Sequence, residues 1–146
     1  MVPPGTTDLG WSPPTGWPLH LVGITVNDLA GALEPWTLLG FAVVAEGEVG
    51  SQGVQVRMLS AGATRREFLA PLFETSPVAR FLAKRGPGLH HVAFRLGDLA
   101  GELGRLQTAG AHLIDDEPRP GFGGHAVAFV HPTSSNGVLV ELVQAP

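Results

Sequence analysis

The feature that most constrains the fold of this 146-residue chain is an internal repeat with an offset of 70 residues. The segment Val-Asn-Asp-Leu-Ala-Gly at 26–31 returns as Leu-Gly-Asp-Leu-Ala-Gly at 96–101, and Gly40 corresponds to Gly110. In each copy an Asp follows an apolar run and is well placed as a helix N-cap, and the Gly stands where a helix ends. The repeat therefore predicts two copies of one supersecondary module.

Each copy is expected to form a strand, a helix and three further strands, which is a βαβββ module. A short helix at 76–84, capped by Ser76 and opened by Pro77, connects the copies. The other expected elements are strands at 19–26, 41–47, 53–60, 64–70, 89–96, 111–115, 125–131 and 137–144, and helices at 28–39 and 98–109.

These modules predict an α+β fold in which two four-stranded sheets with outer helices form a cleft. The inner faces of such sheets can be buried only against each other or against a ligand. We expect one domain over 18–146, with module 1 at about 18–75, a linker helix at 76–86 and module 2 at about 88–146. Residues 1–17 form a Pro-rich N-terminal arm, either pinned to the body by tryptophans or untethered.

Composition excludes several kinds of partner. A net charge of -4 with nine scattered Lys and Arg residues leaves no broad basic surface for nucleic acid. No apolar run approaches the roughly 20 residues of a membrane span, and residues 1–17 lack the pattern of a secretory signal, so we expect a cytoplasmic protein without a membrane partner. Since the chain contains no cysteine, any metal must bind through nitrogen and oxygen ligands.

Three polar residues stand where apolar ones are expected. Glu67 and Glu141 interrupt the apolar last strand of each module. A lone strand glutamate usually faces solvent, but recurrence at the equivalent place favours an inward orientation, where a carboxylate needs a partner or a cation. Strand alternation puts His91 on the face opposite Val92 and Phe94, which suit packing under a helix. Together these three residues are candidate ligands of a divalent ion.

Three stretches resemble the vicinal oxygen chelate superfamily, the glyoxalase and bleomycin-resistance-like proteins, and within it the methylmalonyl-CoA epimerases most. They are Gln-Gly-Val at 52–54, Ser-Pro-Val-Ala-Arg-Phe-Leu at 76–82 leading to Gly-Leu-His-His at 88–91, and Asp-Glu-Pro-Arg-Pro-Gly at 116–121 leading to Phe-Val-His-Pro at 129–132 and Gly-Val-Leu-Val-Glu-Leu at 137–142. The likeness covers about residues 19–144.

The resemblance implies a divalent ion, which is Co, Mn, Ni, Zn or Fe, bound by a His on the first strand, a Gln or Glu on the fourth, a His on the fifth and a Glu on the eighth. The last three correspond to Glu67, His91 and Glu141. Leu21 stands at the first position, and the repeat agrees, because His91 lies 70 residues further on. Either a bulge turns His20 inward as the fourth ligand, or the site has three protein ligands, or the metal is lost.

The reaction implied by the resemblance is epimerisation of a carboxyacyl-CoA thioester, methylmalonyl-CoA, through a metal-stabilised enolate. Glu141 is the candidate catalytic acid–base. Its partner is not identified, because Val56 occupies the position of a glutamate base in some epimerases. Gln52, His125 and His131 are candidate substrate contacts, or else ordinary hydrogen-bonding residues of loops and strand ends.

Two other functions stay open. One is a glyoxalase-type lyase or isomerase, which would use the same metal and a related enolate. The other is a metal-free small-molecule-binding protein of this fold, which Leu21 favours and the intact Glu67, His91 and Glu141 oppose. By analogy with the superfamily we expect a homodimer.

Overall fold

The computed structural model describes residues 16–145, and within this range the βαβββ order occurs twice. Residues 1–15, most of the predicted arm, lie outside the described residues. The first module contains β1 (Leu19–Thr25), α1 (Leu29–Leu38), β2 (Ala42–Val49), β3 (Val54–Ala61) and β4 (Thr64–Pro71). After α2 (Pro77–Arg85), the second contains β5 (Gly88–Arg95), α3 (Leu99–Thr108), β6 (Arg119–Pro120), the 3-10 turn η1 (Phe122–Gly124), β7 (Ala126–Val130), the 3-10 turn η2 (Pro132–Ser134) and β8 (Val140–Gln144). The predicted α+β fold is confirmed.

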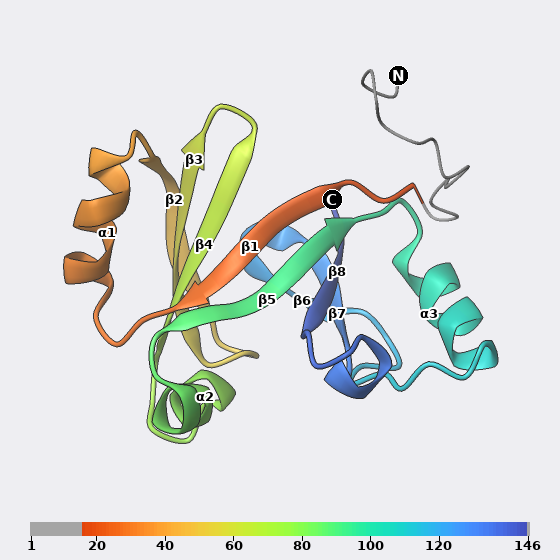
Figure 1. The fold of residues 1–146 in the computed structure, drawn as a ribbon. Coiled ribbons are helices and arrows are strands. Elements are labelled where there is room, and N and C mark those ends of the chain that lie inside the picture. Colours follow the sequence, from red (N-terminus) through yellow and green to blue (C-terminus); the bar gives the residue numbers. More distant parts are fainter. Residues whose placement is uncertain (1–15, 146) are drawn as a thin grey trace, which may run out of the picture.

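The two four-stranded halves join edge to edge in one curled sheet with the order β2-β3-β4-β1-β5-β8-β7-β6. The joint is the antiparallel pair of β1 and β5, which cross the middle of the molecule side by side (Figure 1). The helices α1 and α3 lie at the two ends of the molecule (Figure 1). On either side of this seam, β4 runs parallel to β1, and β8 runs parallel to β5. The last strand of each module therefore flanks the seam.

The helices of the two modules begin and end alike. The side chains of Asp28 and Asp98 each accept a hydrogen bond from the backbone N–H three residues on, at 3.3 and 3.1 Å. Gly40 and Gly110, just past each helix, have φ angles of 97° and 90°, which a residue with a Cβ rarely adopts. α1 and α3 contain ten residues each, and in the described part of the chain no helix has the length and apolar content to traverse a bilayer.

Each outer helix covers one apolar face of its own half-sheet. Leu29 of α1 packs with Leu59 and Phe68, and Leu99 of α3 packs with Leu142. Trp17, at the end of the predicted arm, packs against the cluster under α3. A further cluster lies on the opposite face of the sheet, at the seam, and consists of Leu21, Ala93, Val127 and Val143.

The prediction of a strand at 111–115 is wrong. This segment makes only an isolated bridge between Leu113 and Val130. The carboxylate of Asp115 accepts a hydrogen bond from the backbone N–H of Phe129 at 2.8 Å, and so takes a donor that a paired strand would need. The outer strand forms later, as β6, and stays at two residues because proline has no N–H to donate.

The last strand is shorter than predicted. β8 begins at Val140 rather than at 137. Asn136 and Gly137 have φ angles of 55° and 88°, and the N–H of Val138 bonds to the carbonyl of Ser135 at 3.1 Å. This turn holds the chain away from the ladder until Val140, and Glu141 still lies within the strand.

Candidate metal centre and substrate cavity

Glu67, His91 and Glu141 come from three strands around the seam, at nearly the same level. Gly23 of β1 pairs with Glu67 of β4 and with His91 of β5. Ala93, two residues beyond His91 on the same face, pairs with Glu141 of β8. The register therefore brings one carboxylate from each module to the two sides of one histidine.

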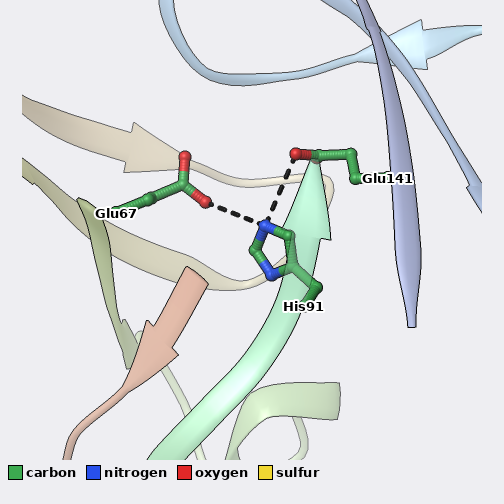
Figure 2. A group of neighbouring side chains, drawn as sticks. All are labelled: Glu67, His91 and Glu141. Atoms are coloured by element: carbon green, nitrogen blue, oxygen red, sulfur yellow. Dashed lines mark ion pairs between the residues drawn. The ribbon is translucent and has the colours of Figure 1, made fainter. Parts of the chain in front are cut away.

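The three side chains converge in the interior. Their exposed fractions are 7% for Glu67, 4% for His91 and 5% for Glu141. The imidazole lies between the two carboxylates, with its Nε2 3.5 Å from an oxygen of each (Figure 2). One ligand atom from each residue can be chosen so that all three lie within 4.8 Å of one another. Within residues 16–145 this is the one such group of three or more metal-ligating residues.

Gly23 makes room for this arrangement. A Cβ placed on Gly23 would lie 2.1 Å from a ring carbon of His91, far inside van der Waals contact. The imidazole therefore lies against the bare backbone of β1, which lets it reach across the seam toward Glu67 of the other module. A glycine at this point of a strand marks close approach of another group.

The electrostatics of the three residues favour a bound cation. Burial and the nearby charge of Glu141 raise the pKa of Glu67 to about 7, against a smaller lowering by His91. Burial by itself would lower the pKa of His91, but contact with Glu141 and the charge of both carboxylates raise it. Among the described residues, Nε2 of His91 is a buried atom with no hydrogen-bond partner. Two buried carboxylates beside an imidazole nitrogen that makes no hydrogen bond are suited to a divalent ion.

His90 is hydrogen-bonded to His91. The two Nδ1 atoms lie 2.9 Å apart, so one of them donates a hydrogen bond to the other. Burial, with a further contribution from His91, lowers the pKa of His90 to about 3 and keeps its ring neutral. With Nδ1–H of His91 as the donor, Nε2 carries the lone pair that a metal needs. These observations fit a divalent ion held by Glu67, His91 and Glu141.

His20 and Leu21 both face the region of these carboxylates. The pairing of β1 with β5 shifts between Leu19 and Leu21, so His20 is an extra residue at a bulge. His20 and Leu21 line a cavity of about 390 Å³ together with Glu67 and Glu141. His20 is not part of the three-residue ligand group. Leu21, 4% exposed, packs in the apolar cluster at the seam, where the repeat would place a histidine.

The candidate substrate contacts occupy different places. His125 lines the same cavity as Glu67 and Glu141, with its Nδ1 2.8 Å from the carbonyl oxygen of Phe122. Gln52 lines a separate cavity of about 190 Å³ that also contains His90 and His91. His131 lies at the start of η2, where its ring stacks on His112 at 4.3 Å, and among the described residues it lines neither cavity.

The sequence interpretation missed two residues near the site, Arg65 and His90. Arg65 lines the 390 Å³ cavity. Arg65 lies two residues before Glu67 on β4, so the two side chains point to the same face of the sheet. Strand alternation in the sequence is enough to predict this. Strand alternation places neighbouring His90 and His91 on opposite faces of β5 and gives no sign that the two rings meet, yet their Nδ1 atoms lie 2.9 Å apart.

The family model described as Glyoxalase/Bleomycin resistance protein/Dioxygenase superfamily matches residues 20–129. The chain belongs to this superfamily. The resemblance inferred from the repeat and motifs is thereby confirmed. One superfamily relative is the ethylmalonyl-CoA/methylmalonyl-CoA epimerase of Cereibacter sphaeroides, 40% identical over 129 residues, with 86% of this chain and 96% of the relative covered. Another is the uncharacterized protein YqjC of Bacillus subtilis, 40% identical over 127 residues, with 86% and 91% covered.

A solved structure agrees with these relatives. The crystal structure of methylmalonyl-CoA epimerase from Mycobacterium tuberculosis superimposes with a TM-score of 0.83 at 39% identity, covering 88% of each chain. Members of the superfamily with an epimerase name are therefore similar to this chain in sequence and in fold over most of its length.

Proposed function

We propose that this chain is a metal-dependent isomerase that epimerises a carboxyacyl-CoA thioester, with methylmalonyl-CoA as its substrate. The observation that carries the proposal is the buried group of Glu67, His91 and Glu141, whose donor atoms converge beside a cavity. Support for the substrate comes from the epimerase relative that is 40% identical over 96% of its own length.

The cavity has the character that such chemistry requires. Its apolar walls include Leu21, Val127 and Val143, which limit water around a reacting carbon. Arg65 and His125 line the same cavity and offer hydrogen-bond donors to a substrate carboxylate. The acidic residues among its lining are Glu67 and Glu141, which belong to the ligand group.

Glu67, His91 and Glu141 would hold the divalent ion. When bound, the ion would act as a Lewis acid and stabilise negative charge that develops on the substrate carbonyl oxygen. Glu141 is the chain's acid–base residue in this proposal, since its carboxylate has an oxygen to spare for a proton. His90 keeps His91 in the tautomer that presents Nε2 to the site.

Exchange of the substrate α-proton tests this function. Purified protein with one equivalent of Co²⁺ or Mn²⁺ is mixed with methylmalonyl-CoA in deuterated water, and deuterium at the α-carbon is followed by NMR. The wild type is expected to exchange the proton and interconvert the epimers, and Glu141→Ala is expected to slow both by at least about 100-fold. No exchange by the loaded wild type, or an unaltered rate in Glu141→Ala, would contradict the proposal.

Leu21 favours one second candidate, a metal-free small-molecule-binding protein. Metal analysis of protein purified without a chelator separates the two functions. The epimerase should contain a transition metal or gain thermal stability when Co²⁺ or Mn²⁺ is added. Less than about a tenth of an equivalent, with no gain on addition, would favour the binding protein. The homodimer, the cytoplasmic location and the lack of a nucleic-acid partner stay predictions from the sequence.

A further inference from the structure

Resting on the proposed function, we infer that His20 is the second acid–base residue and exchanges the α-proton with the substrate on the face opposite Glu141. The inversion of a carbon centre needs one group that removes the proton from one face and another that returns a proton to the other face. The sequence leaves this second group unassigned, because Val56 occupies the position of a glutamate base in some epimerases.

The bulge in β1 gives His20 access to the cavity. Leu19 pairs with Phe94 and Leu21 with Ala93, so three residues of β1 lie opposite two of β5. In a regular strand, neighbours point to opposite faces, and His20 would turn away wherever Leu21 turns inward. With the bulge, both side chains line the same cavity.

The register also brings His20 close to the level of Glu141. Ala93 pairs with Leu21 on one side and with Glu141 on the other. His125, the other histidine of the cavity, precedes Ala126, which pairs with Gln144, three residues beyond Glu141. Three residues of strand correspond to about 10 Å. His20 is thus the better placed of the two histidines to meet a substrate held at Glu141.

The surroundings of His20 keep its ring able to accept a proton. Burial is the main cause that lowers its pKa, and the nearby Arg65, His125 and Arg95 lower it further, while Glu141 acts in the opposite direction. The ring of His125 lies edge-on at 5.8 Å. An arginine cannot serve as a base, and His125 lies further along the strands from Glu141, so we assign His20 as the partner of Glu141.

In each direction of the reaction, one group takes a proton from the substrate and the other group gives one back. From one epimer, the Glu141 carboxylate takes the α-proton, the C–H electron pair moves into the thioester carbonyl, and the imidazolium of His20 gives its N–H proton to the other face. From the other epimer, neutral His20 takes the proton and the protonated Glu141 carboxyl returns one. Both starting forms carry the same number of protons, so each turnover leaves the enzyme ready for the reverse reaction.

Deuterium exchange measured separately for each epimer tests the assignment. His20→Gln is expected to lower epimerisation at least about 100-fold. In His20→Gln, the epimer whose proton Glu141 removes should still take up deuterium at the α-carbon, without inversion. The other epimer should no longer take up deuterium. A loss of packing alone would slow both exchanges together, so equal slowing of both overturns the assignment.

Controls separate this outcome from failure of the proposed function. His112→Gln, an exposed histidine outside the cavity lining, controls for substitution of a histidine as such. Thermal melting and Co²⁺ binding of His20→Gln should match the wild type, because His20 lies outside the ligand group. If wild-type protein exchanges neither epimer, the proposed function fails; if it exchanges both and His125→Gln shows the one-sided pattern instead of His20→Gln, only the assignment of His20 fails.

Discussion

At the scale of single residues, the energetic cost of the site lies in Glu67, a carboxylate buried beside a second one. Its pKa rises to about 7 from an ordinary value of 4.5, so the protonated form is favoured in the folded state. Such a group stabilises the fold below its unfolded pKa, and the contribution is lost as the pH rises through the folded pKa. The raised pKa of His91 acts in the same direction. A bound cation would remove this cost.

We therefore expect the melting temperature of metal-free protein to fall as the pH rises from about 6.5 to 8. The lowered pKa values of His20 and His90 act mainly below this window, since these histidines bind protons more weakly in the folded state. Differential scanning calorimetry in the presence of a chelator measures the slope. Glu67→Gln has no titrating group at position 67, so its melting temperature should fall less steeply with pH than that of the wild type. An equally steep fall would contradict this account.

His90 offers a second prediction at this scale. If Nδ1–H of His91 donates to His90, Nε2 of this candidate ligand is free to bind a metal, and the ring of His90 also meets Phe81 edge-on at 4.8 Å. His90→Phe keeps an aromatic ring and removes the hydrogen bond, so Co²⁺ affinity should fall by about 10-fold to 100-fold. Isothermal titration measures the affinity, with His112→Phe as the control. An unchanged dissociation constant in a folded His90→Phe protein would mean that His91 is oriented without it.

At the scale of elements, β1 and β5 are equivalent strands that differ at the ligand position. Leu21 corresponds to His91 and lies in the apolar cluster with Ala93 and Val127. Leu21→His would add a fourth protein ligand, and we expect Co²⁺ to bind at least about 10-fold more tightly, with a lower melting temperature in the absence of metal. Competition with a chelator gives the affinity. Weaker Co²⁺ binding than in the wild type would show that β1 cannot present an imidazole from this position.

The repeat and strand alternation were enough to predict the order of elements, the inward carboxylates and the side of β5 on which His91 lies. Strand alternation is read within a few residues, and the repeat is read by comparing two segments of the sequence that lie 70 residues apart. The lost strand at 111–115 depends on the bond between Asp115 and Phe129, fourteen residues apart. The bulge at His20 depends on pairing with β5 across the seam. Contacts of this kind between distant segments leave no periodic trace in the sequence.

At the scale of the whole molecule, the candidate ligands join the two modules. Glu67 belongs to the first module and His91 and Glu141 to the second, so a bound ion would connect them across the seam of β1 and β5. Ligand at 100 times its dissociation constant stabilises a fold by about 2.7 kcal/mol. We expect added Co²⁺ to raise the melting temperature and to slow amide exchange most in β1 and β5. Protection confined to the outer strands β2 and β6 would contradict this.

Leu21 makes the two halves of the site unequal, which affects how a bound molecule can be oriented in it. Two equivalent modules with equivalent ligands would form a site with a twofold axis, in which a substrate could lie in two orientations of equal energy. Each reacting face would then meet each protein group half of the time. Leu21, at the position of the first module that corresponds to His91, removes that degeneracy, because one half of the site is apolar and the other carries the imidazole. A molecule entering the cavity therefore meets two sides that differ.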